Sequence, residues 1–185
     1  MRVISGSAHG RRLLSPKNRL IRPTSDRVKE SLFNIVSVLL GSFDRCGILD
    51  IFAGSGALGI EALSRGAASA VFIDKDKESA ALIRKNLEMC GLCDRARVVE
   101  RDALVALSLV EKREPPFRLV LIDPPYGYGL AEKVLGYLAD SSLIDDKSIV
   151  VAEISSKELL PSAYGALSEF DRRVYGDTAI VFFRR

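Results

Sequence analysis

LDIFAGSGALG, residues 49–59, places a short apolar run directly before three glycines, Gly54, Gly56 and Gly59. The spacing is G-x-G-x-x-G at a strand-to-helix turn, which is typical of proteins that bind a nucleoside-containing cofactor. Asp74 follows twenty residues after Gly54, at the end of the next apolar run. A carboxylate at that distance can accept hydrogen bonds from ribose hydroxyls. We therefore expect a cofactor to lie across this loop.

Short apolar runs alternate with helical segments on both sides of the turn. We predict strands at residues 47–52, 70–73, 97–100, 119–122, 148–154, 167–174 and 178–183, and helices at residues 57–65, 76–90, 103–112 and 130–139. This alternation implies an α/β fold with a mostly parallel sheet and helices on both faces. Only three residues separate the last two strands, too few for a crossover, so they should form a terminal antiparallel hairpin. Seven strands in this arrangement are typical of the Rossmann-like class I methyltransferase fold.

The chain before this pattern is predicted to form a small extension. Residues 2–5 and 11–14 are short mixed runs around a glycine-containing turn, consistent with a hairpin. Residues 24–40 have the spacing of an amphipathic helix, set by Val28, Leu32, Ile35 and Leu39. We predict a basic N-terminal extension at residues 1–41, packed on a methyltransferase domain at residues 42–185.

Length and composition are those of a globular protein with one sizeable core. The chain has 185 residues, of which 48% are hydrophobic and 28% charged. No apolar run is long enough to cross a membrane, and the first residues lack the apolar core of a signal peptide. With three cysteines, these features lead us to expect a cytoplasmic protein, a monomer, with no metal and no membrane partner.

The positive charge is concentrated at the N-terminus. Residues 1–30 carry eight lysines and arginines against two acidic residues, whereas the remaining 155 residues carry nineteen against twenty-two. A basic arm on a slightly acidic body indicates a polyanionic partner that is held by the arm. A solvated charged terminus would give the same count.

Acidic residues distinguish between the cofactors that a glycine loop can bind. Asp50, Asp74, Asp102, Asp123 and Glu153 all fall at predicted carboxyl ends of strands, where ligands of such sheets bind. S-adenosylmethionine carries a sulfonium and an ammonium, whereas a dinucleotide carries a pyrophosphate. We therefore expect S-adenosylmethionine. Asp102 could instead only cap the following helix, and Glu153 could be structural. The candidate cofactor-binding residues are Asp50, Phe52, Gly54, Ser55, Gly56, Asp74, Asp102 and Ala103.

The motif Asp123, Pro124, Pro125, Tyr126 supplies the candidate catalytic residues. Two prolines hold the backbone extended and leave carbonyls that accept hydrogen bonds. If the Asp123 carboxylate and the Pro124 carbonyl each accept one N–H of an exocyclic amine, the nitrogen lone pair turns toward a methyl donor. Tyr126 can stack on a base that is flipped out of its helix. The motif indicates an amino group as the target, but does not distinguish guanine from adenine.

Several stretches together resemble a known family. They are GRRL at residues 10–13, IRPTSDRVKESLFN at 21–34, LDIFAGSGALGIEALSRG at 49–66, DPPY at 123–126 and YG at 175–176. Over nearly the whole chain, the sequence is similar to the bacterial 16S rRNA guanine-N2 methyltransferase family, RsmD.

The resemblance implies a set of roles. Asp74 would bind the cofactor ribose, Asp102 the adenine amine, and the Gly54 and Gly56 loop the methionine part. Asp123 to Tyr126 would hold the target, which is guanine 966 of 16S rRNA within the small ribosomal subunit or its assembly intermediate. The candidate substrate-binding residues are Arg11, Arg12, Arg22, Thr24 and Arg27.

Three other functions are compatible with parts of the sequence. Related motifs occur in enzymes that methylate adenine N6 in DNA or a protein glutamine. An NAD-dependent oxidoreductase would explain the glycine loop and Asp74 but not the DPPY motif. A non-catalytic RNA-binding module would explain the basic arm alone. The pair Cys90 and Cys93 lacks the further ligands of a zinc site and is interpreted as packing.

Overall fold

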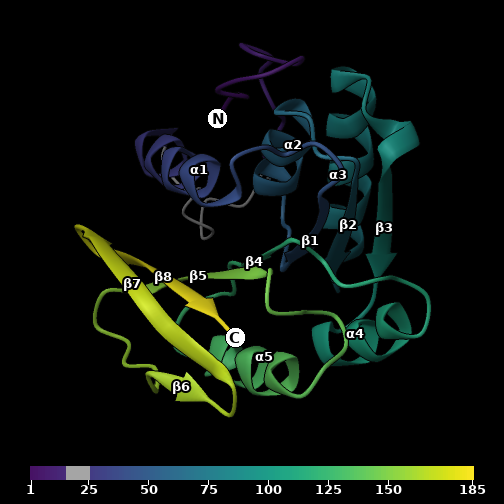
Figure 1. The fold of residues 1–185 in the computed structure, drawn as a ribbon. Coiled ribbons are helices and arrows are strands. Elements are labelled where there is room, and N and C mark those ends of the chain that lie inside the picture. Colours follow the sequence, from purple (N-terminus) through teal and green to yellow (C-terminus); the bar gives the residue numbers. More distant parts are fainter. Residues whose placement is uncertain (16–25) are drawn as a thin grey trace.

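The computed structural model describes residues 1–15 and 26–185 (Figure 1). Five α-helices and one short 3-10 helix alternate with eight strands within these residues. The helices are α1 (Asp26–Leu40), α2 (Ala57–Ser64), α3 (Lys77–Cys90), η1 (Cys93–Arg95), α4 (Ala103–Glu111) and α5 (Leu130–Ala139). The strands are β1 (Gly47–Ile51), β2 (Ser69–Asp74), β3 (Ala96–Glu100), β4 (Leu119–Ile122), β5 (Ile149–Ser155), β6 (Ala163–Tyr164), β7 (Leu167–Tyr175) and β8 (Thr178–Arg184).

The strands of the described chain form one sheet in the order β3-β2-β1-β4-β5-β8-β7-β6. The first five of these strands are parallel. Strand β8 pairs antiparallel with β5, β7 pairs antiparallel with β8, and β6 pairs antiparallel with β7. The strand order reverses between β1 and β4, and ligands of open α/β sheets bind beyond the carboxyl ends of the strands at such a switch point.

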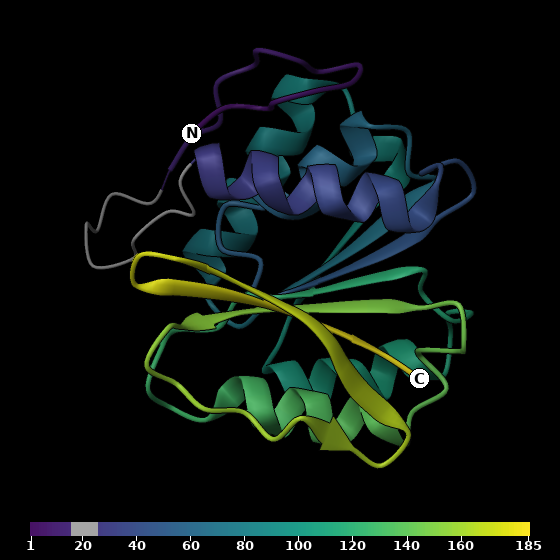
Figure 2. The same cartoon turned by 60° about the vertical axis from the view of Figure 1, so that its left-hand side comes forward.

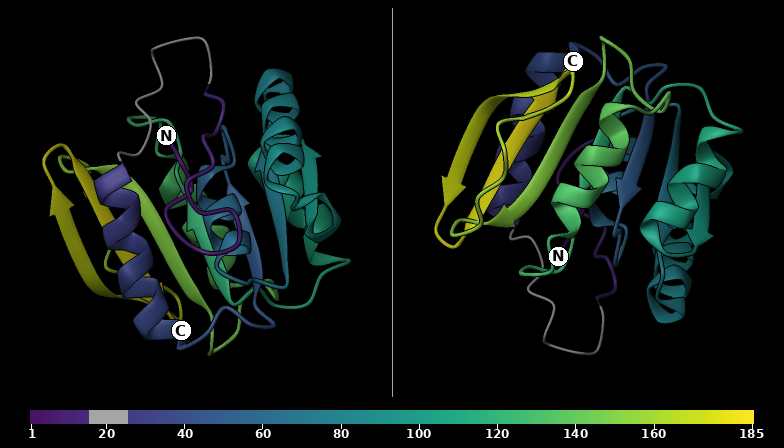
Figure 3. Two further views of the ribbon diagram at one scale, coloured as in Figure 1. Left: turned by 90° about the horizontal axis from the view of Figure 1, so that it is seen from above. Right: turned by 90° about the horizontal axis from the view of Figure 1, so that it is seen from below.

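Two helical layers enclose the sheet, as Figure 2 shows. Buried side chains of α1, α2 and α3 pack in one hydrophobic cluster, and those of α4 and α5 pack in a second cluster on the opposite face. The views from above and below in Figure 3 show α1 with the N-terminal segment on one face and α5 with α4 on the other. The methyltransferase-type layout predicted from the sequence is confirmed.

The N-terminal segment, residues 1–14, folds back onto α2. A single antiparallel bridge joins Arg2 to Arg12, so the predicted hairpin exists as a turn without two regular strands. Gly6 has a φ of +86°, and a Cβ there would lie 1.8 Å from the carbonyl oxygen of Ser64. Only glycine permits this approach, which lets the N–H of Ser7 donate to that oxygen at 2.8 Å.

The predicted boundaries agree with the structure to within two residues, apart from one strand. Strand β6 was not predicted, because a two-residue edge strand is too short to show alternation. The helix predicted at residues 24–40 begins at Asp26 in the described chain, and residues 24 and 25 lie outside the described residues. The division into an extension at 1–41 and a domain at 42–185 stays a prediction, since α1 shares its hydrophobic cluster with α2 and the sheet.

Candidate active site

The glycine loop lies at the carboxyl end of β1 and is supported from below by Asp50. The Asp50 carboxylate is 1% exposed and accepts a hydrogen bond from the backbone N–H of Gly59 at 2.8 Å. A Cβ on Gly59 would lie 2.3 Å from the ring of Phe72 and 3.0 Å from that carboxylate, so glycine lets α2 pack closely on the sheet. Burial raises the pKa of Asp50 to about 7. In this structure Asp50 therefore supports the glycine loop indirectly, because it binds a backbone N–H in the first turn of α2, the helix that follows the loop.

The loop itself has a left-handed backbone at three positions. Phe52 has a φ of +62°, which is unfavourable for a residue with a Cβ, and Gly54 and Gly56 have φ values of +55° and +77°. The N–H of Gly54 donates to Oδ2 of Asp74 at 2.8 Å, while Oδ1 of Asp74 accepts from the N–H of Asp76 at 2.9 Å. The structure thus brings together the two sequence features, loop and acid, from which a cofactor site was predicted.

Asp102 and Ala103 lie at the start of α4, beyond the carboxyl end of β3. The exposed Asp102 caps this helix, because its Oδ1 accepts from the N–H of Leu104 at 3.1 Å. The capping interpretation is therefore confirmed in this structure, and a contact of Asp102 with the adenine amine stays a prediction. Ala103 is buried beside it.

The motif at residues 123–126 follows β4 directly and lies next to the glycine loop. The N–H of Asp123 donates to the carbonyl of Ile51 at 3.2 Å, one residue before the left-handed Phe52. Pro124 is buried and Pro125 exposed. The hydroxyl of Tyr126 lies 3.3 Å from Oγ1 of Thr178 and 3.5 Å from Oε1 of Glu153.

Tyr126 joins the motif to two neighbouring strands of the sheet. Glu153 is on β5 and Thr178 on β8, and both are buried, whereas Tyr126 itself is 38% exposed. Desolvation raises the pKa of Tyr126 to about 12, with added contributions from the charges of Glu153 and Asp123. The phenol is therefore neutral at physiological pH and presents an exposed ring at the edge of the site.

Three of the five predicted substrate residues can be placed. Arg11 and Arg12 are exposed on the N-terminal segment, and Arg27 is exposed on α1. Arg22 and Thr24 lie outside the described residues.

Asn86 connects the N-terminal segment to the glycine loop, a role that the sequence analysis missed. This fully buried side chain on α3 donates to the carbonyls of Leu14, at 3.1 Å, and Ser55, at 2.8 Å. Its Oδ1 accepts from the N–H of Leu14 at 2.8 Å. The segment that carries Arg11 and Arg12 is thus anchored to the loop where the cofactor is expected.

The buried carboxylate of Glu61 is a second group that holds the N-terminal segment in place and that the sequence analysis missed. The carboxylate of Glu61 on α2 accepts from the N–H groups of Ile4, at 2.7 Å, and Ser5, at 3.0 Å. The Arg65 guanidinium donates to it at 2.8 Å, and the Lys29 ammonium lies 3.6 Å away. Burial lowers the pKa of Lys29. A polar residue within an otherwise apolar helix pattern was the available signal for Glu61.

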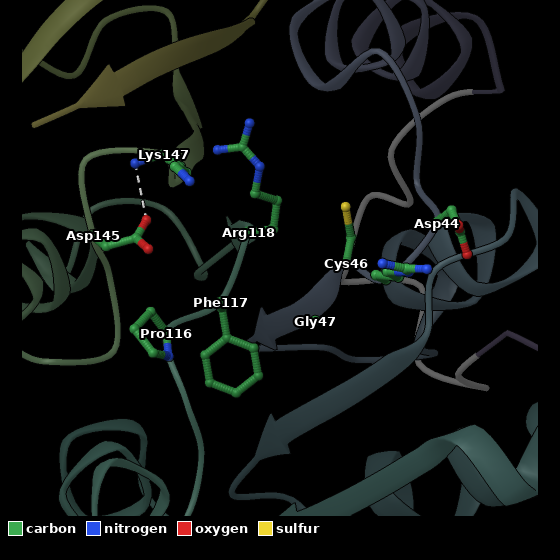
Figure 4. Close-up of a pocket in the computed structure, with 9 residues that line it drawn as sticks. Asp44, Cys46, Gly47, Pro116, Phe117, Arg118, Asp145 and Lys147 are labelled. Carbon is green, nitrogen blue, oxygen red and sulfur yellow. Dashed lines mark hydrogen bonds between the residues drawn. The ribbon is translucent and has the colours of Figure 1, made fainter.

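A separate pocket of about 260 Å³ lies at the amino ends of β1, β4 and β5, at the edge of the sheet opposite the two motifs (Figure 4). It is lined by Asp44, Arg45, Cys46, Gly47, Pro116, Phe117, Arg118, Asp145 and Lys147. Ligands of parallel α/β sheets bind at the carboxyl ends, so this pocket does not belong to the predicted cofactor site.

Within residues 1–15 and 26–185, no three metal-ligating side chains gather at one point. None of the helices described has the length and apolar character that a bilayer crossing requires. Burial raises the pKa values of the Cys46 and Cys90 thiols, which makes them less reactive.

The fold and the site define the class of Rossmann-like methyltransferases. The chain has a parallel sheet whose strand order reverses at β1 and β4, a terminal antiparallel hairpin, a glycine loop with left-handed backbone and an adjoining DPPY motif. Comparison with known proteins narrows this class to one family. The chain belongs to the family described as "Conserved hypothetical protein 95", whose model matches residues 1–184, and the predicted resemblance to the RsmD family is confirmed.

Relatives match over the full length. The chain is 38% identical to "Putative rRNA methyltransferase YlbH" of Bacillus subtilis, over 100% of this chain and 99% of that protein. It is 36% identical to "Ribosomal RNA small subunit methyltransferase D" of Escherichia coli, over 100% of this chain and 90% of that protein. A solved structure, "Putative methyltransferase yhhF from Escherichia coli", has a TM-score of 0.84 and 35% identity, covering 100% of this chain and 97% of the other.

Proposed function

We propose that this chain transfers a methyl group from S-adenosylmethionine to the exocyclic N2 of a guanine in 16S rRNA, within the small ribosomal subunit. One observation carries the proposal beyond the family relationship. The N–H of Asp123 donates to the carbonyl of Ile51, so the DPPY motif lies directly beside the start of the glycine loop. This adjacency supports the proposal, because an amino group bound by the motif would lie at the same edge of the sheet as a cofactor bound at the loop.

The residues around the glycine loop fit S-adenosylmethionine. Asp74 presents a half-buried carboxylate at the end of β2, held in place by two backbone N–H groups, and a ribose would bind there. At Gly54, a Cβ would meet only the carbonyl oxygen of Phe52, at 4.0 Å, so the loop leaves open space above its backbone. The bound cofactor supplies an electrophilic methyl group on sulfur. A positively charged ligand is also favoured by the acidic groups at this edge.

The amino group is activated by position and not by a strong base. The nitrogen lone pair of guanine N2 is delocalised into the ring, and two hydrogen bonds from this nitrogen to fixed acceptors orient the lone pair toward the methyl group. Asp123 and the carbonyl of Pro124 are those acceptors in the proposal, and the negative charge of Asp123 stabilises the positive charge that develops on nitrogen. The exposed ring of Tyr126 provides the surface on which the base stacks.

The N-terminal segment supplies the polyanion contact in this proposal. Arg11 and Arg12 are exposed on a segment that Asn86 and Glu61 fix to the catalytic domain. Cations held in a defined position relative to the site can orient the phosphate backbone as well as attract it.

The test is methyl transfer with purified protein, labelled S-adenosylmethionine and small subunits that lack the modification. We expect N2-methylguanine at one position, less transfer to naked 16S rRNA, and none to duplex DNA. Asp123→Ala should lower the turnover by far more than tenfold, that is, by more than ~1.4 kcal/mol of barrier, while leaving the affinity for S-adenosylhomocysteine unchanged. Recovery of N6-methyladenine, or of label on a protein glutamine, would contradict the guanine assignment and favour the alternative amino-group targets.

A further inference from the structure

Thr178, the first residue of β8, contacts Tyr126 but has no role in the reaction as proposed above. The hydroxyl groups of the two residues lie 3.3 Å apart, although the residues are separated by 52 positions in the sequence. Thr178 is 8% exposed, so its hydroxyl is shielded from water and needs a partner within the protein. A polar group at the edge of the site is therefore directed at the aromatic residue of the DPPY motif.

The sheet fixes the backbone of Thr178 on both sides. Thr178 pairs with Ser155 of β5 and with Tyr175 of β7. Because β8 is antiparallel to β5, it begins at the carboxyl end of β5, which is the edge of the sheet that carries the DPPY motif. Just before β8, the carbonyl of Asp177 accepts from the N–H of Ser156 at 2.8 Å. The position of the Thr178 hydroxyl relative to the motif is thus set by backbone hydrogen bonds to two neighbouring strands.

The hydroxyl of Tyr126 has a donor and an acceptor role. A carboxylate oxygen only accepts, so Tyr126 donates its single proton to Glu153, at 3.5 Å, and Thr178 is the donor in its own contact with Tyr126. Burial raises the pKa of Tyr126 to about 12, and of its two hydrogen bonds the one with Thr178 lowers this pKa whereas the one with Glu153 raises it. Both distances exceed the usual range of about 2.5–3.0 Å for hydroxyl groups, so each bond is weak alone and the phenol depends on both.

Tyr126 is held at its hydroxyl end while its ring stays accessible. The residue is 38% exposed, although Glu153 and Thr178 are both buried. A ring whose Cβ is fixed by the backbone and whose hydroxyl is fixed by two strands has one orientation. A base that stacks on such a ring does not have to order it first.

We propose that Thr178 is a positioning residue that orients the ring of Tyr126 for stacking on the target base. This inference rests on the proposed function. Tyr126 follows Asp123 by three residues, so the plane of its ring decides where the amino group of a stacked base lies relative to the Asp123 carboxylate. A displacement of about 1 Å in such a geometry can lower a rate on the order of 100-fold. Thr178 therefore acts on the rate of methyl transfer through Tyr126, and not on the binding of the cofactor.

The experiment measures kcat and KM for methyl transfer to small subunits that lack the modification. It compares the wild type with Thr178→Val, which keeps the shape of the side chain without its hydroxyl, and with Thr178→Ser, which keeps the hydroxyl. The net contribution of one such hydrogen bond corresponds to about fivefold, so Thr178→Val should lower kcat by about that factor. The KM for subunits and the Kd for S-adenosylhomocysteine should stay within about twofold of the wild type, and Thr178→Ser should retain at least about half of the wild-type kcat.

A double-mutant cycle with Tyr126→Phe tests whether Thr178 acts through the phenol. Tyr126→Phe keeps the ring but removes its hydroxyl, and should lower kcat at least as much as Thr178→Val. In the Tyr126→Phe protein, Thr178→Val should have no further effect on kcat, because the partner of Thr178 is gone. Tyr175→Phe is the matched control: it removes a hydroxyl that lies 2.5 Å from Oγ of Ser31, on the residue that pairs with Thr178. It should lower Tm and leave kcat unchanged.

Several results would count against the inference. An unchanged kcat in Thr178→Val, or a loss that adds in full to that of Tyr126→Phe, would overturn the role of Thr178 and leave the proposed function intact. An equal loss of kcat in Tyr175→Phe would do the same, because the effect would then be one of general stability. If Thr178→Val does not fold, Tyr126→Phe and Thr178→Ser decide, since only the first should lower kcat. Failure of the wild type to methylate the subunits would overturn the proposed function and this inference together.

Discussion

Replacing Asn86 by leucine tests whether the N-terminal segment is held to the glycine loop as the structure shows. The substitution keeps the volume approximately but removes three hydrogen bonds, two with Leu14 and one with the carbonyl of Ser55. A buried group left without its partner costs about 1–3 kcal/mol, and the bonds with Leu14 are only partly buried. We therefore expect the free energy of unfolding to fall by roughly 3–5 kcal/mol, which for a chain of this length lowers Tm by roughly 10 °C.

Thermal unfolding followed by circular dichroism measures this loss, and hydrogen exchange at the amide of Leu14 locates it. Lys85→Ala is the matched control, because Lys85 is exposed on the same helix and its removal should change stability by less than about 0.5 kcal/mol. Affinity for S-adenosylhomocysteine, measured well below Tm, should also fall, since the carbonyl of Ser55 belongs to the loop. A Tm within about 2 °C of the wild type, with Leu14 exchange unchanged, would refute the anchoring argument.

Three further predictions follow from the site. Asp74→Asn should weaken binding of S-adenosylhomocysteine about tenfold in calorimetry while turnover at saturating cofactor partly survives, and an unchanged Kd would remove Asp74 from the cofactor site. Arg11→Ala combined with Arg12→Ala should flatten the salt dependence of subunit binding by a slope of up to about 1.8, and an unchanged slope would mean that neither arginine contacts phosphate. The pKa of Asp50 is raised by burial to about 7, so its contribution to stability is full below its unfolded value near 4 and is lost as the pH rises through 7. The unfolding free energy of the wild type, relative to that of Asp50→Asn, should therefore fall by up to ~1.4 kcal/mol per pH unit as the pH rises between these two pKa values. A difference in unfolding free energy that does not change with pH would contradict the raised pKa of Asp50.

The alternation of apolar runs was enough to predict the sheet and its helices, because buried parallel strands and the helices between them leave strong periodic signals. The glycine loop, Asp74 and the DPPY motif could be predicted for a second reason. Each is defined by a few residues at a fixed spacing. What such spacing could not reveal was whether Asp102 caps its helix, since one carboxylate can serve either a backbone N–H or a ligand.

The contacts that hold the N-terminal segment could not be predicted, because they join residues far apart in the sequence. Glu61 and Asn86 are polar residues on helices, where polar side chains usually face the solvent, and only the apolar residues around Glu61 in α2 indicate burial. In the structure both are fully buried, and the partners through which they hold the N-terminal segment are backbone groups of Ile4, Ser5 and Leu14. Backbone partners leave no trace in side-chain patterns.

The anchoring of Leu14 by Asn86 also affects the order in which parts of the chain can fold during synthesis. The two residues are 72 positions apart, and the ribosome adds roughly 5–20 residues per second, so the first segment waits about 4–14 s for its partner to be made. Until residue 64 has been added, which takes up most of this interval, the segment has neither α2 nor α3 to pack against. Its apolar side chains, Val3, Ala8 and Leu13, are then exposed on the nascent chain. The earliest part of the protein to be synthesised is thus among the later parts to reach its folded position.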